Sequence, residues 1–311
     1  MQADIVASTA DPVSRSIVEA PERMTDSPTL VRAPAGAVAP VVFDSPHSGF
    51  TWPADFMPTA PADAVRSTWD AHVERLFEGA PSVGATLLAA TFPRAYIDVN
   101  RAVSDLDPAL IDGPWSGPLD PTDYSRRGMG LIRRDALPGV PMYAAPLAVA
   151  AVRARIDASY RPYRARLSAV IEELHAMHGV VWHVNCHSMK SRGNAMNVDA
   201  GATRPDLVIS DRRGTTAEPG LAARIVGWFT LRGYRVQVND PYQGGDLVRT
   251  FGDPARGRSS VQIEINRALY MDEATTEPHA GFAPLQEDLT AFAAVFAQWA
   301  NDAAARARAR G

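Results

Sequence analysis

Residues 171–188 read IEELHAMHGVVWHVNCHS, and this stretch decides the fold. Its first part ends a long helical pattern over residues 146–177, in which apolar residues repeat at helical spacing. Gly179 is suited to end that helix, and the apolar residues 180–184 that follow it predict a buried strand. We expect Pro162 to kink or divide the helix, because proline has no amide hydrogen to donate.

The same alternation extends in both directions along the chain. Short apolar runs predict strands at residues 41–43, 85–90, 95–99, 207–209, 234–238 and 261–265, and helical patterns cover residues 221–231 and 285–305. Strands that alternate with helices predict an α/β fold with a mainly parallel sheet covered on both faces. We expect one domain over residues 29–311 and a flexible tail over residues 1–28, which are rich in Ser, Thr, Pro, Asp and Glu.

The composition is that of an ordinary globular protein. Of the 311 residues, 46% are hydrophobic and 21% are charged, which rules out general disorder. The formal net charge of −4 offers no basic excess for binding nucleic acid or an anionic membrane. No stretch approaches the ~20 apolar residues of a membrane-spanning helix, and residues 1–11 do not resemble a secretion signal. The single cysteine, Cys186, excludes an internal disulfide, so a reducing, cytoplasmic location is the default expectation.

Four polar clusters each follow a predicted strand. They are residues 44–49 (DSPHSG), 98–101 (DVNR), 185–188 (NCHS) and 264–267 (EINR). Because ligands bind at the carboxyl ends of strands in such sheets, we expect these clusters to converge. Two histidines, several carboxylates and two Asn-Arg pairs suit a metal hydrolase for an anionic substrate. Protein ligands hold the metal, a carboxylate takes a proton from water, and arginines bind carboxylates and stabilise the oxyanion.

Structural interpretations of the same residues are also possible. A histidine after a strand is more often a hydrogen-bonded loop residue than a metal ligand. Glu264 can be neutralised by a structural pair with Arg267, and Asp70 can simply favour the start of a helix. We interpret His183 as packed within its strand and Cys186 as a small buried thiol. The sequence contains no GxSxG, HExxH or P-loop motif, and no GxGxxG after a strand, which excludes other common catalytic templates.

In their order along the chain, the clusters resemble the N-formylglutamate amidohydrolase family. The matching stretches are VFDSPHSG (42–49), FPRAYIDVNR (92–101), NCHSM (185–189), NDPYQGG (239–245) and QIEINRALYMDE (262–273). That family is similar to zinc carboxypeptidases and aspartoacylase-type deacylases, so the resemblance implies a three-layer α/β/α fold with a mostly parallel, mixed central sheet. It also implies that water attacks the formyl carbon of N-formyl-L-glutamate, at the end of a histidine-degradation route, and releases formate and glutamate.

The resemblance assigns metal binding to His47 and His187, with zinc as the expected ion and manganese or cobalt as alternatives. Related zinc peptidases place a glutamate three residues after the first histidine, where this chain has Phe50, so the third ligand stays open here. Asp70 is our choice, because it follows the His47 loop and can point back at the metal. The lesser candidates are Asp44 and Glu74.

The resemblance also implies roles in catalysis and substrate binding. Glu264 is the expected general base and proton donor, and Arg94 is expected to polarise the scissile carbonyl. The expected substrate-binding residues are Asn100 and Arg101 for the α-carboxylate, Arg267 or Arg249, on charge alone, for the side-chain carboxylate, and Tyr242 for the intermediate. The expected partner is a small anionic N-acyl amino acid. Two alternatives remain: a deacylase or carboxypeptidase-like hydrolase of another acidic N-acyl compound, and a metal-free carboxylate-binding protein.

Overall fold

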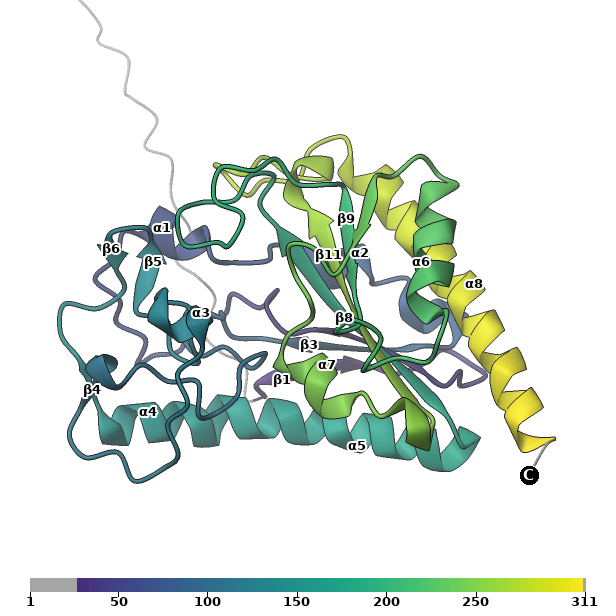
Figure 1. Cartoon of the computed structure of the whole chain (residues 1–311), viewed down its shortest axis with the longest axis horizontal. Helices are drawn as coiled ribbons and strands as arrows, with labels where there is room; N and C mark the ends of the chain where they lie inside the picture. The colour runs from purple at the N-terminus through teal and green to yellow at the C-terminus, as the bar shows by residue number, and fades with distance from the viewer. Residues whose placement is uncertain (1–26, 310–311) are drawn as a thin grey trace, which may run out of the picture.

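A mixed sheet of seven strands forms the centre of the protein (Figure 1). The computed structural model describes residues 27–309. In spatial order the strands are β1 (Thr29–Arg32), β3 (Thr86–Ala90), β2 (Val41–Ser45), β8 (Val181–Met189), β11 (Arg258–Asn266), β9 (Leu207–Ser210) and β10 (Val236–Val238). Strands β3, β2, β8 and β11 are parallel, whereas β1 pairs antiparallel with β3 and β9 pairs antiparallel with β11. The prediction of an α/β fold with a mixed sheet is therefore confirmed.

Helices cover both faces of this sheet (Figure 1). Helix α5 (Arg161–His178), which continues from α4 (Val149–Arg155), packs against one face and contacts β2 and β8. Helices α6 (Leu221–Thr230), α8 (Phe282–Arg308) and α2 (Val73–Leu76) pack against the other face. Each face has its own apolar cluster, because successive residues of a strand point to opposite sides of the sheet.

The remaining elements are short. The helices are α1 (Ala62–Arg66), α3 (Asp123–Arg126) and α7 (Asp246–Phe251), and the small strand pairs are β4 (Ile111–Asp112) with β7 (Leu147–Ala148) and β5 (Asp135–Leu137) with β6 (Val140–Pro141). None of the helices in the described part of the chain is long and apolar enough to span a membrane. The tail expected over residues 1–28 lies outside the described residues, apart from Ser27 and Pro28.

The predicted long helix forms with a local change of pitch. α4 continues into α5 through a π-helical turn at Ile156–Tyr160. This turn lies next to Pro162, whose missing amide hydrogen removes one bond from the regular helical ladder. The expected division of the helix at Pro162 thus takes the form of a π turn rather than a break. The helix ends at Gly179, whose φ of 77° is a left-handed conformation that favours glycine.

Two expectations about strand position are wrong. Residues 95–99 form turns rather than a strand, and the amide of Asp98 donates to the carbonyl oxygen of Leu131 instead of to a neighbouring strand. Strand β8 continues to Met189 rather than ending at residue 184, because it pairs in parallel with β11 along its whole length. The polar residues 185–188 therefore lie inside a strand and not after one.

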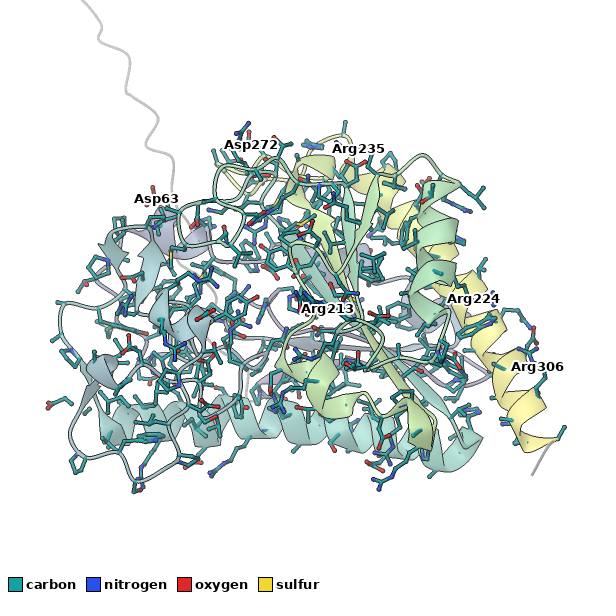
Figure 2. All side chains as sticks on the ribbon, viewed as in Figure 1. Asp63, Arg213, Arg224, Arg235, Asp272 and Arg306 are labelled. Atoms are coloured by element: carbon teal, nitrogen blue, oxygen red, sulfur yellow. The ribbon has the colours of Figure 1, made fainter. Side chains whose placement is uncertain are left out.

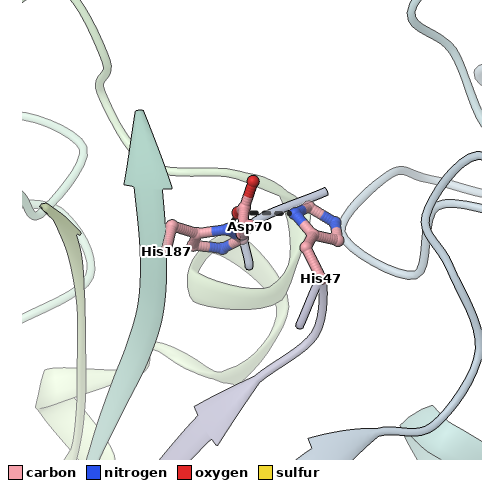
Figure 3. Close-up of side chains that lie close together, drawn as sticks. All are labelled: His47, Asp70 and His187. Atoms are coloured by element: carbon pink, nitrogen blue, oxygen red, sulfur yellow. Dashed lines mark hydrogen bonds and ion pairs between the residues drawn. The ribbon is translucent and has the colours of Figure 1, made fainter. Parts of the chain in front are cut away.

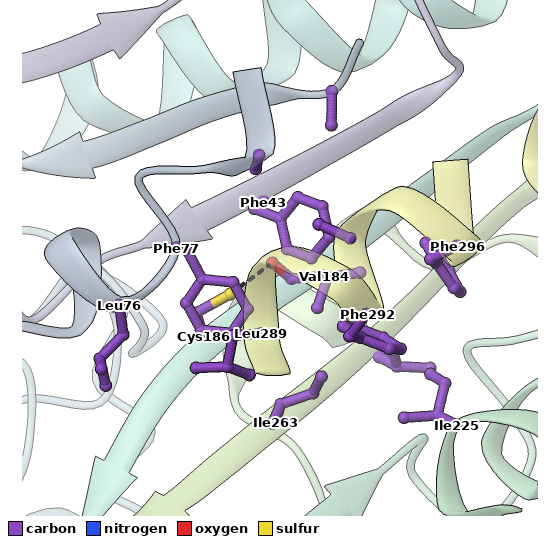
Figure 4. Packing of buried hydrophobic residues seen from close by; sticks show 14 of the residues in the cluster. Phe43, Leu76, Phe77, Val184, Cys186, Ile225, Ile263, Leu289, Phe292 and Phe296 are labelled. Carbon is purple, nitrogen blue, oxygen red and sulfur yellow. Dashed lines mark hydrogen bonds between the residues drawn. The ribbon is translucent and has the colours of Figure 1, made fainter. Parts of the chain in front are cut away.

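The face covered by α6 and α8 contains an aromatic cluster (Figure 4). The ring centroid of Phe43 in β2 lies 5.4 Å from that of Phe77 and 6.4 Å from that of Phe292 in α8. Cys186 is fully buried in the same cluster, where its thiol donates to the carbonyl oxygen of Val184. Burial raises the pKa of this thiol well above its usual range, and the interpretation of Cys186 as a small buried thiol is confirmed.

Candidate active site

The candidate site lies on the polar faces of two neighbouring strands. Residues 183, 185 and 187 of β8 share one face, while the apolar residues between them enter the core, and β11 alternates in the same way. The register of the two strands pairs His183 with Ser260, Asn185 with Gln262, and His187 with Glu264. His187, Gln262 and Glu264 of this polar face, together with the loops around them, line a cavity.

Three buried side chains from distant parts of the chain meet beside this face (Figure 3). His47 follows β2, Asp70 precedes α2 and His187 belongs to β8. Their candidate ligand atoms lie within 4.8 Å of one another. Oδ2 of Asp70 is 3.0 Å from Nδ1 of His187 and 3.4 Å from Nδ1 of His47. Two imidazole nitrogens and a carboxylate oxygen form a ligand set that could bind a divalent transition metal.

A polar side chain holds the opposite nitrogen of each imidazole. Oδ1 of Asp98 is 2.7 Å from Nε2 of His47, and Oδ1 of Asn185 is 2.7 Å from Nε2 of His187. Both Nε2 atoms therefore donate a proton, and both Nδ1 atoms turn a lone pair toward Asp70. Nδ1 of His47 is buried and has no hydrogen-bond partner among the described residues. Because a buried nitrogen without a partner is costly, this arrangement fits a bound metal ion.

The three candidates for the third ligand lie in different places. Asp44 belongs to another buried network, in which Oδ1 is 2.6 Å from Nε2 of His183 and Oδ2 accepts from the hydroxyl of Tyr163 at 2.8 Å. Glu74 lies in α2 and borders a different cavity. Of the three, Asp70 is the one that reaches both histidines.

Two arginines bind the two aspartates of the site. Nη2 of Arg267 donates to Oδ1 of Asp70 at 2.8 Å, and Nη2 of Arg94 donates to Oδ2 of Asp98 at 2.7 Å. Burial alone would raise the pKa of Asp70, but the neighbouring imidazoles of His187 and His47 and the charge of Arg94 outweigh burial and hold this pKa well below its usual range. Burial is likewise outweighed at Asp98, where Arg94 has the largest effect in lowering the pKa. Arg267 thus pairs with Asp70 and not, as the structural interpretation of the sequence suggested, with Glu264.

Glu264 borders the same cavity and is 7% exposed. One of its oxygens accepts a hydrogen bond from Nε2 of Gln262 at 2.9 Å. Burial, with a further contribution from the negative charge of Asp70, raises the pKa of this carboxyl above its usual range. A carboxyl with a raised pKa beside a candidate metal site is suited to accept and return a proton.

The predicted substrate-binding and electrophilic residues fall into two groups. Those that line the cavity are Arg94, Asn100, Arg101, Tyr242 and Arg267. Arg249 does not line it, because its side chain is 56% exposed on α7 and donates to Oδ1 of Asp246. The structure therefore places Arg249 outside the site to which its charge alone had assigned it.

Asn100 and Arg101 are both predicted to bind the α-carboxylate, but they differ in whether their polar groups are available to a substrate. Oδ1 of Asn100 accepts from the amide of Leu247 at 2.8 Å, and Nδ2 lies 3.0 Å from Nε2 of His187 and 3.3 Å from Oδ1 of Asn185. Both ends of the Asn100 amide are thus used within the protein, which makes it a positioning residue. The guanidinium of Arg101 stacks on the ring of Tyr124 at 4.0 Å, so it is fixed at the cavity wall and suited to bind an anion.

Sequence reasoning assigns no role to several residues that complete the site. Asn185 and Gln262 continue the alternation of polar and apolar residues along their strands, and this pattern could have identified them. Asp98 lies in one of the four clusters but has no pattern that marks it as the partner of His47. The cavity is also lined by Arg133, Lys190 and Arg204, which lie outside the motifs.

Comparison with known proteins gives consistent matches. Residues 39–271 match the family model described as N-formylglutamate amidohydrolase. The chain is 30% identical over 253 residues to N-formylglutamate deformylase of Pseudomonas aeruginosa, covering 80% of this chain and 87% of that protein. It is 28% identical over 244 residues to N-formylglutamate deformylase of Pseudomonas putida, covering 77% of this chain and 84% of that protein.

Solved structures match over most of the chain. The crystal structure of N-formylglutamate amidohydrolase from Ralstonia eutropha JMP134 has a TM-score of 0.85 and 44% identity, covering 89% of this chain and 99% of that one. A gene product from Agrobacterium tumefaciens shares the fold with a TM-score of 0.60 at 20% identity, covering 91% of this chain and 96% of that one. The family match extends over more than half of the chain and includes every residue of the candidate site, so this chain belongs to the N-formylglutamate amidohydrolase family.

Proposed function

We propose that the protein hydrolyses N-formyl-L-glutamate, or a closely related N-acyl amino acid, to formate and L-glutamate with the help of a divalent metal ion. The proposal rests on the buried group of His47, Asp70 and His187, which shares with Glu264 a cavity lined by six arginine and lysine side chains. It is supported by relatives that are named N-formylglutamate deformylases or amidohydrolases. The proposal includes the zinc-carboxypeptidase-like fold and the place in histidine degradation that the sequence resemblance implies.

His47, Asp70 and His187 would hold the metal, with zinc expected first and manganese or cobalt as alternatives. When bound, such an ion supplies Lewis-acid activation of water and of the scissile carbonyl. Asp98 and Asn185 keep the two imidazoles protonated at Nε2, so that Nδ1 of each ring stays available as a ligand.

Glu264 is the proposed general base. Its raised pKa makes the carboxylate basic enough to take a proton from water and then to protonate the leaving amine. Arg94 is proposed to stabilise the negative charge that develops on the carbonyl oxygen. Its guanidinium borders the cavity and is fixed by Asp98, and its Nε has no hydrogen-bond partner among the described residues.

The cavity favours an anionic substrate. Its six arginine and lysine side chains outnumber the two carboxylates that line it, Asp70 and Glu264, so the cavity attracts a dianion. Arg101, which is fixed against the ring of Tyr124, is proposed to bind the α-carboxylate with two-point geometry. Tyr242 is proposed to donate a hydrogen bond to the intermediate. Burial raises the pKa of its hydroxyl, which therefore keeps its proton at neutral pH.

Formate release from N-formyl-L-glutamate is the direct test. Protein of measured metal content is assayed before chelation, after chelation, and after zinc is added back. We expect turnover to disappear with the metal and to return with zinc. Turnover that survives complete metal removal would contradict the role of the metal. Absence of turnover with one metal ion per chain would contradict the substrate, and a panel of acidic N-acyl amino acids would then identify the correct one.

The variant Glu264→Gln separates chemistry from metal binding. Glutamine has the same size as glutamate but accepts no proton. We therefore expect unchanged metal content and a kcat lowered by about 10²- to 10⁴-fold. The matched control is Glu287→Gln on the exposed side of α8, which leaves kcat unchanged. Near-normal turnover in Glu264→Gln would rule out Glu264 as the base.

A further inference from the structure

Six arginine and lysine side chains line the cavity, and four of them bind groups of the protein itself. Arg94 binds Asp98, Arg267 binds Asp70, Arg204 donates to both oxygens of Asp199, and Arg101 donates to two backbone carbonyl oxygens. The other two side chains are Arg133 and Lys190, and neither has such a partner within residues 27–309.

Arg133 is a buried cation that forms no ion pair within residues 27–309, although Asp98 and Asp70 are near enough to oppose the lowering of its pKa. Its side chain is 8% exposed, and its buried Nε has no hydrogen-bond partner in the described part of the chain. Burial, together with the like charge of Arg94, lowers its pKa to about 9. An unpaired buried charge destabilises the folded protein, whereas a bound anion would relieve that cost. The guanidinium therefore has the properties of an anion receptor.

Lys190 is the single lysine in the sequence and directly follows β8. Burial and the positive charges of Arg267 and Arg133 lower its pKa to about 8. Glu273 is near enough to oppose this effect, but its carboxylate accepts a hydrogen bond from the amide of Ser191. Two cations with lowered pKa values thus line the same cavity, and the charge of Arg133 contributes to lowering the pKa of Lys190.

We propose that Arg133 and Lys190 form the receptor for the side-chain carboxylate of an acidic N-acyl amino acid, with Arg133 as the specificity-determining residue. This inference rests on the proposed function, and it replaces the assignment of that carboxylate to Arg267 or Arg249. Arg267 is occupied by Asp70, and Arg249 lies outside the cavity.

The chemistry of the substrate requires two separate receptors. A substrate such as N-formyl-L-glutamate has two carboxylates joined by a chain of methylene groups. Nε and Nη1 of Arg101 donate to backbone carbonyl oxygens, so its outer edge at Nη2 can bind only one of the two carboxylates. The planar guanidinium of Arg133 can contact the second carboxylate at two points, and Lys190 adds a point charge. Four apolar side chains line the same cavity and can contact the methylene groups: Met129, Ala136, Met189 and Met196.

A pair of substrates tests the receptor. N-formyl-L-glutamate and N-formyl-L-glutamine have nearly the same size and differ in the charge of the side chain. We expect Arg133→Met to lower the ratio of their kcat/KM values by roughly 100-fold. Arg133→Lys keeps the charge but loses the two-point contact, so the ratio should fall by less. Equal losses on both substrates would mean that Arg133 acts on a part that they share, or on the fold, and would overturn the proposal.

The matched control is Arg306→Met. Arg306 is exposed on α8, does not line the cavity and is labelled in Figure 2. We expect the substrate ratio to keep its wild-type value in this variant. A similar fall of the substrate ratio in Arg133→Met and Arg306→Met would show that the loss of any positive charge lowers the ratio. That result would overturn the specific role of Arg133.

A second readout needs no turnover. Because Lys190 is the single lysine, an amine-acetylating reagent modifies it and the α-amino group, and mass spectrometry separates the two products. We expect glutarate, but not butyrate, to slow acetylation of Lys190 in the wild type, and we expect Arg133→Met to abolish that protection. No protection of Lys190 by glutarate in the wild type would overturn the receptor. If the wild type hydrolyses neither substrate, the proposed function fails, while the acetylation result still decides the receptor.

Discussion

Oδ1 of Asn185 lies 2.7 Å from Nε2 of His187, and the groups around Asn185 fix the direction of this hydrogen bond. Nδ2 of Asn185 donates to the carboxylate of Asp44 at 2.8 Å, so the end of the amide that faces His187 is the oxygen. Nδ2 of Asn100 lies 3.3 Å from the same oxygen and 3.0 Å from Nε2 of His187, but Nε2 has its shortest contact with the oxygen, which can only accept. His187 therefore donates through Nε2, which leaves the lone pair of Nδ1 directed toward Asp70.

This arrangement predicts that Asn185 sets the metal affinity without touching the metal. Asn185→Ala removes the acceptor that orients the imidazole of His187, so we expect metal affinity to fall by about 10- to 100-fold. Competition with a chromophoric chelator measures this change. Asp302→Ala, at an exposed position of α8, is the control. An affinity equal to that of the wild type would show that packing alone orients the ring.

The network around Asp44 predicts a dependence of stability on pH. Burial raises the pKa of Asp44, but the charge of His183 and the hydrogen bonds from its neighbours outweigh burial and lower it below 3.8. A depressed pKa in the folded state adds stability above the pKa of the unfolded chain, and this stability is lost as the pH falls through both values. We therefore expect Asp44→Asn to lower the free energy of unfolding at pH 7 by about 1.5–3 kcal/mol.

The difference between the wild type and Asp44→Asn should shrink as the pH falls below 3.8, because the wild-type carboxyl then becomes neutral as well. Urea unfolding midpoints between pH 7 and pH 2.5 would show this convergence. A difference that stays constant over that range would mean that the charge of Asp44 does not contribute to stability.

The sequence could indicate those site residues that lie in a local motif. His47, His187 and Glu264 each belong to a polar cluster at or near the end of a strand, and the structure brings all three to one cavity. Asp70 has no motif, and its place depends on the contact between two segments that are 117 residues apart, seen in its 3.0 Å contact with His187. Arg133 lies in a loop whose path is set by tertiary contacts, so no local pattern indicates that it enters the cavity.

The errors in the fold prediction arise because an apolar run and a strand need not coincide. The apolar run at residues 180–184 ends before β8 does, since β8 and β11 present one face to a cavity and the other to the core. Such a strand alternates between polar and apolar residues at the end near the cavity, so its apolar run stops too early. The segment 95–99 shows the opposite error: it is apolar because it is buried, and it forms turns.

Arg267 and Arg249 carry the same charge, but Arg267 lines the cavity and Arg249 lies outside it. Arg267→Met removes the partner of Asp70, so we expect kcat/KM to fall by about 10- to 100-fold, the value of one lost hydrogen bond to a charged group. Arg249→Met should change kcat/KM by less than about twofold, since its side chain is exposed and bonds to Asp246. Formate release measures both. A large loss in Arg249→Met would indicate that α7 moves toward the substrate during turnover.

The lowered pKa of Lys190 leads us to expect a loss of substrate affinity at alkaline pH. Its pKa of about 8 is set by burial and by the charged groups that surround it, which are Arg267, Glu273, Arg133 and Arg204. Above pH 8 the ammonium loses its proton and no longer attracts the side-chain carboxylate. We therefore expect KM for N-formyl-L-glutamate to rise as the pH passes through 8, while KM for N-formyl-L-glutamine changes little over the same range.

Substitution of Lys190 tests whether this residue causes the effect. Lys190→Arg keeps the positive charge to higher pH, so the rise in KM should move upward. Lys190→Met has no proton to lose, so its KM should be high at all pH values, without a step near 8. The rate of acetylation of wild-type Lys190 should increase over the same interval, because the neutral amine is the nucleophile. A KM step near pH 8 that persists in Lys190→Met would assign the titration to another group.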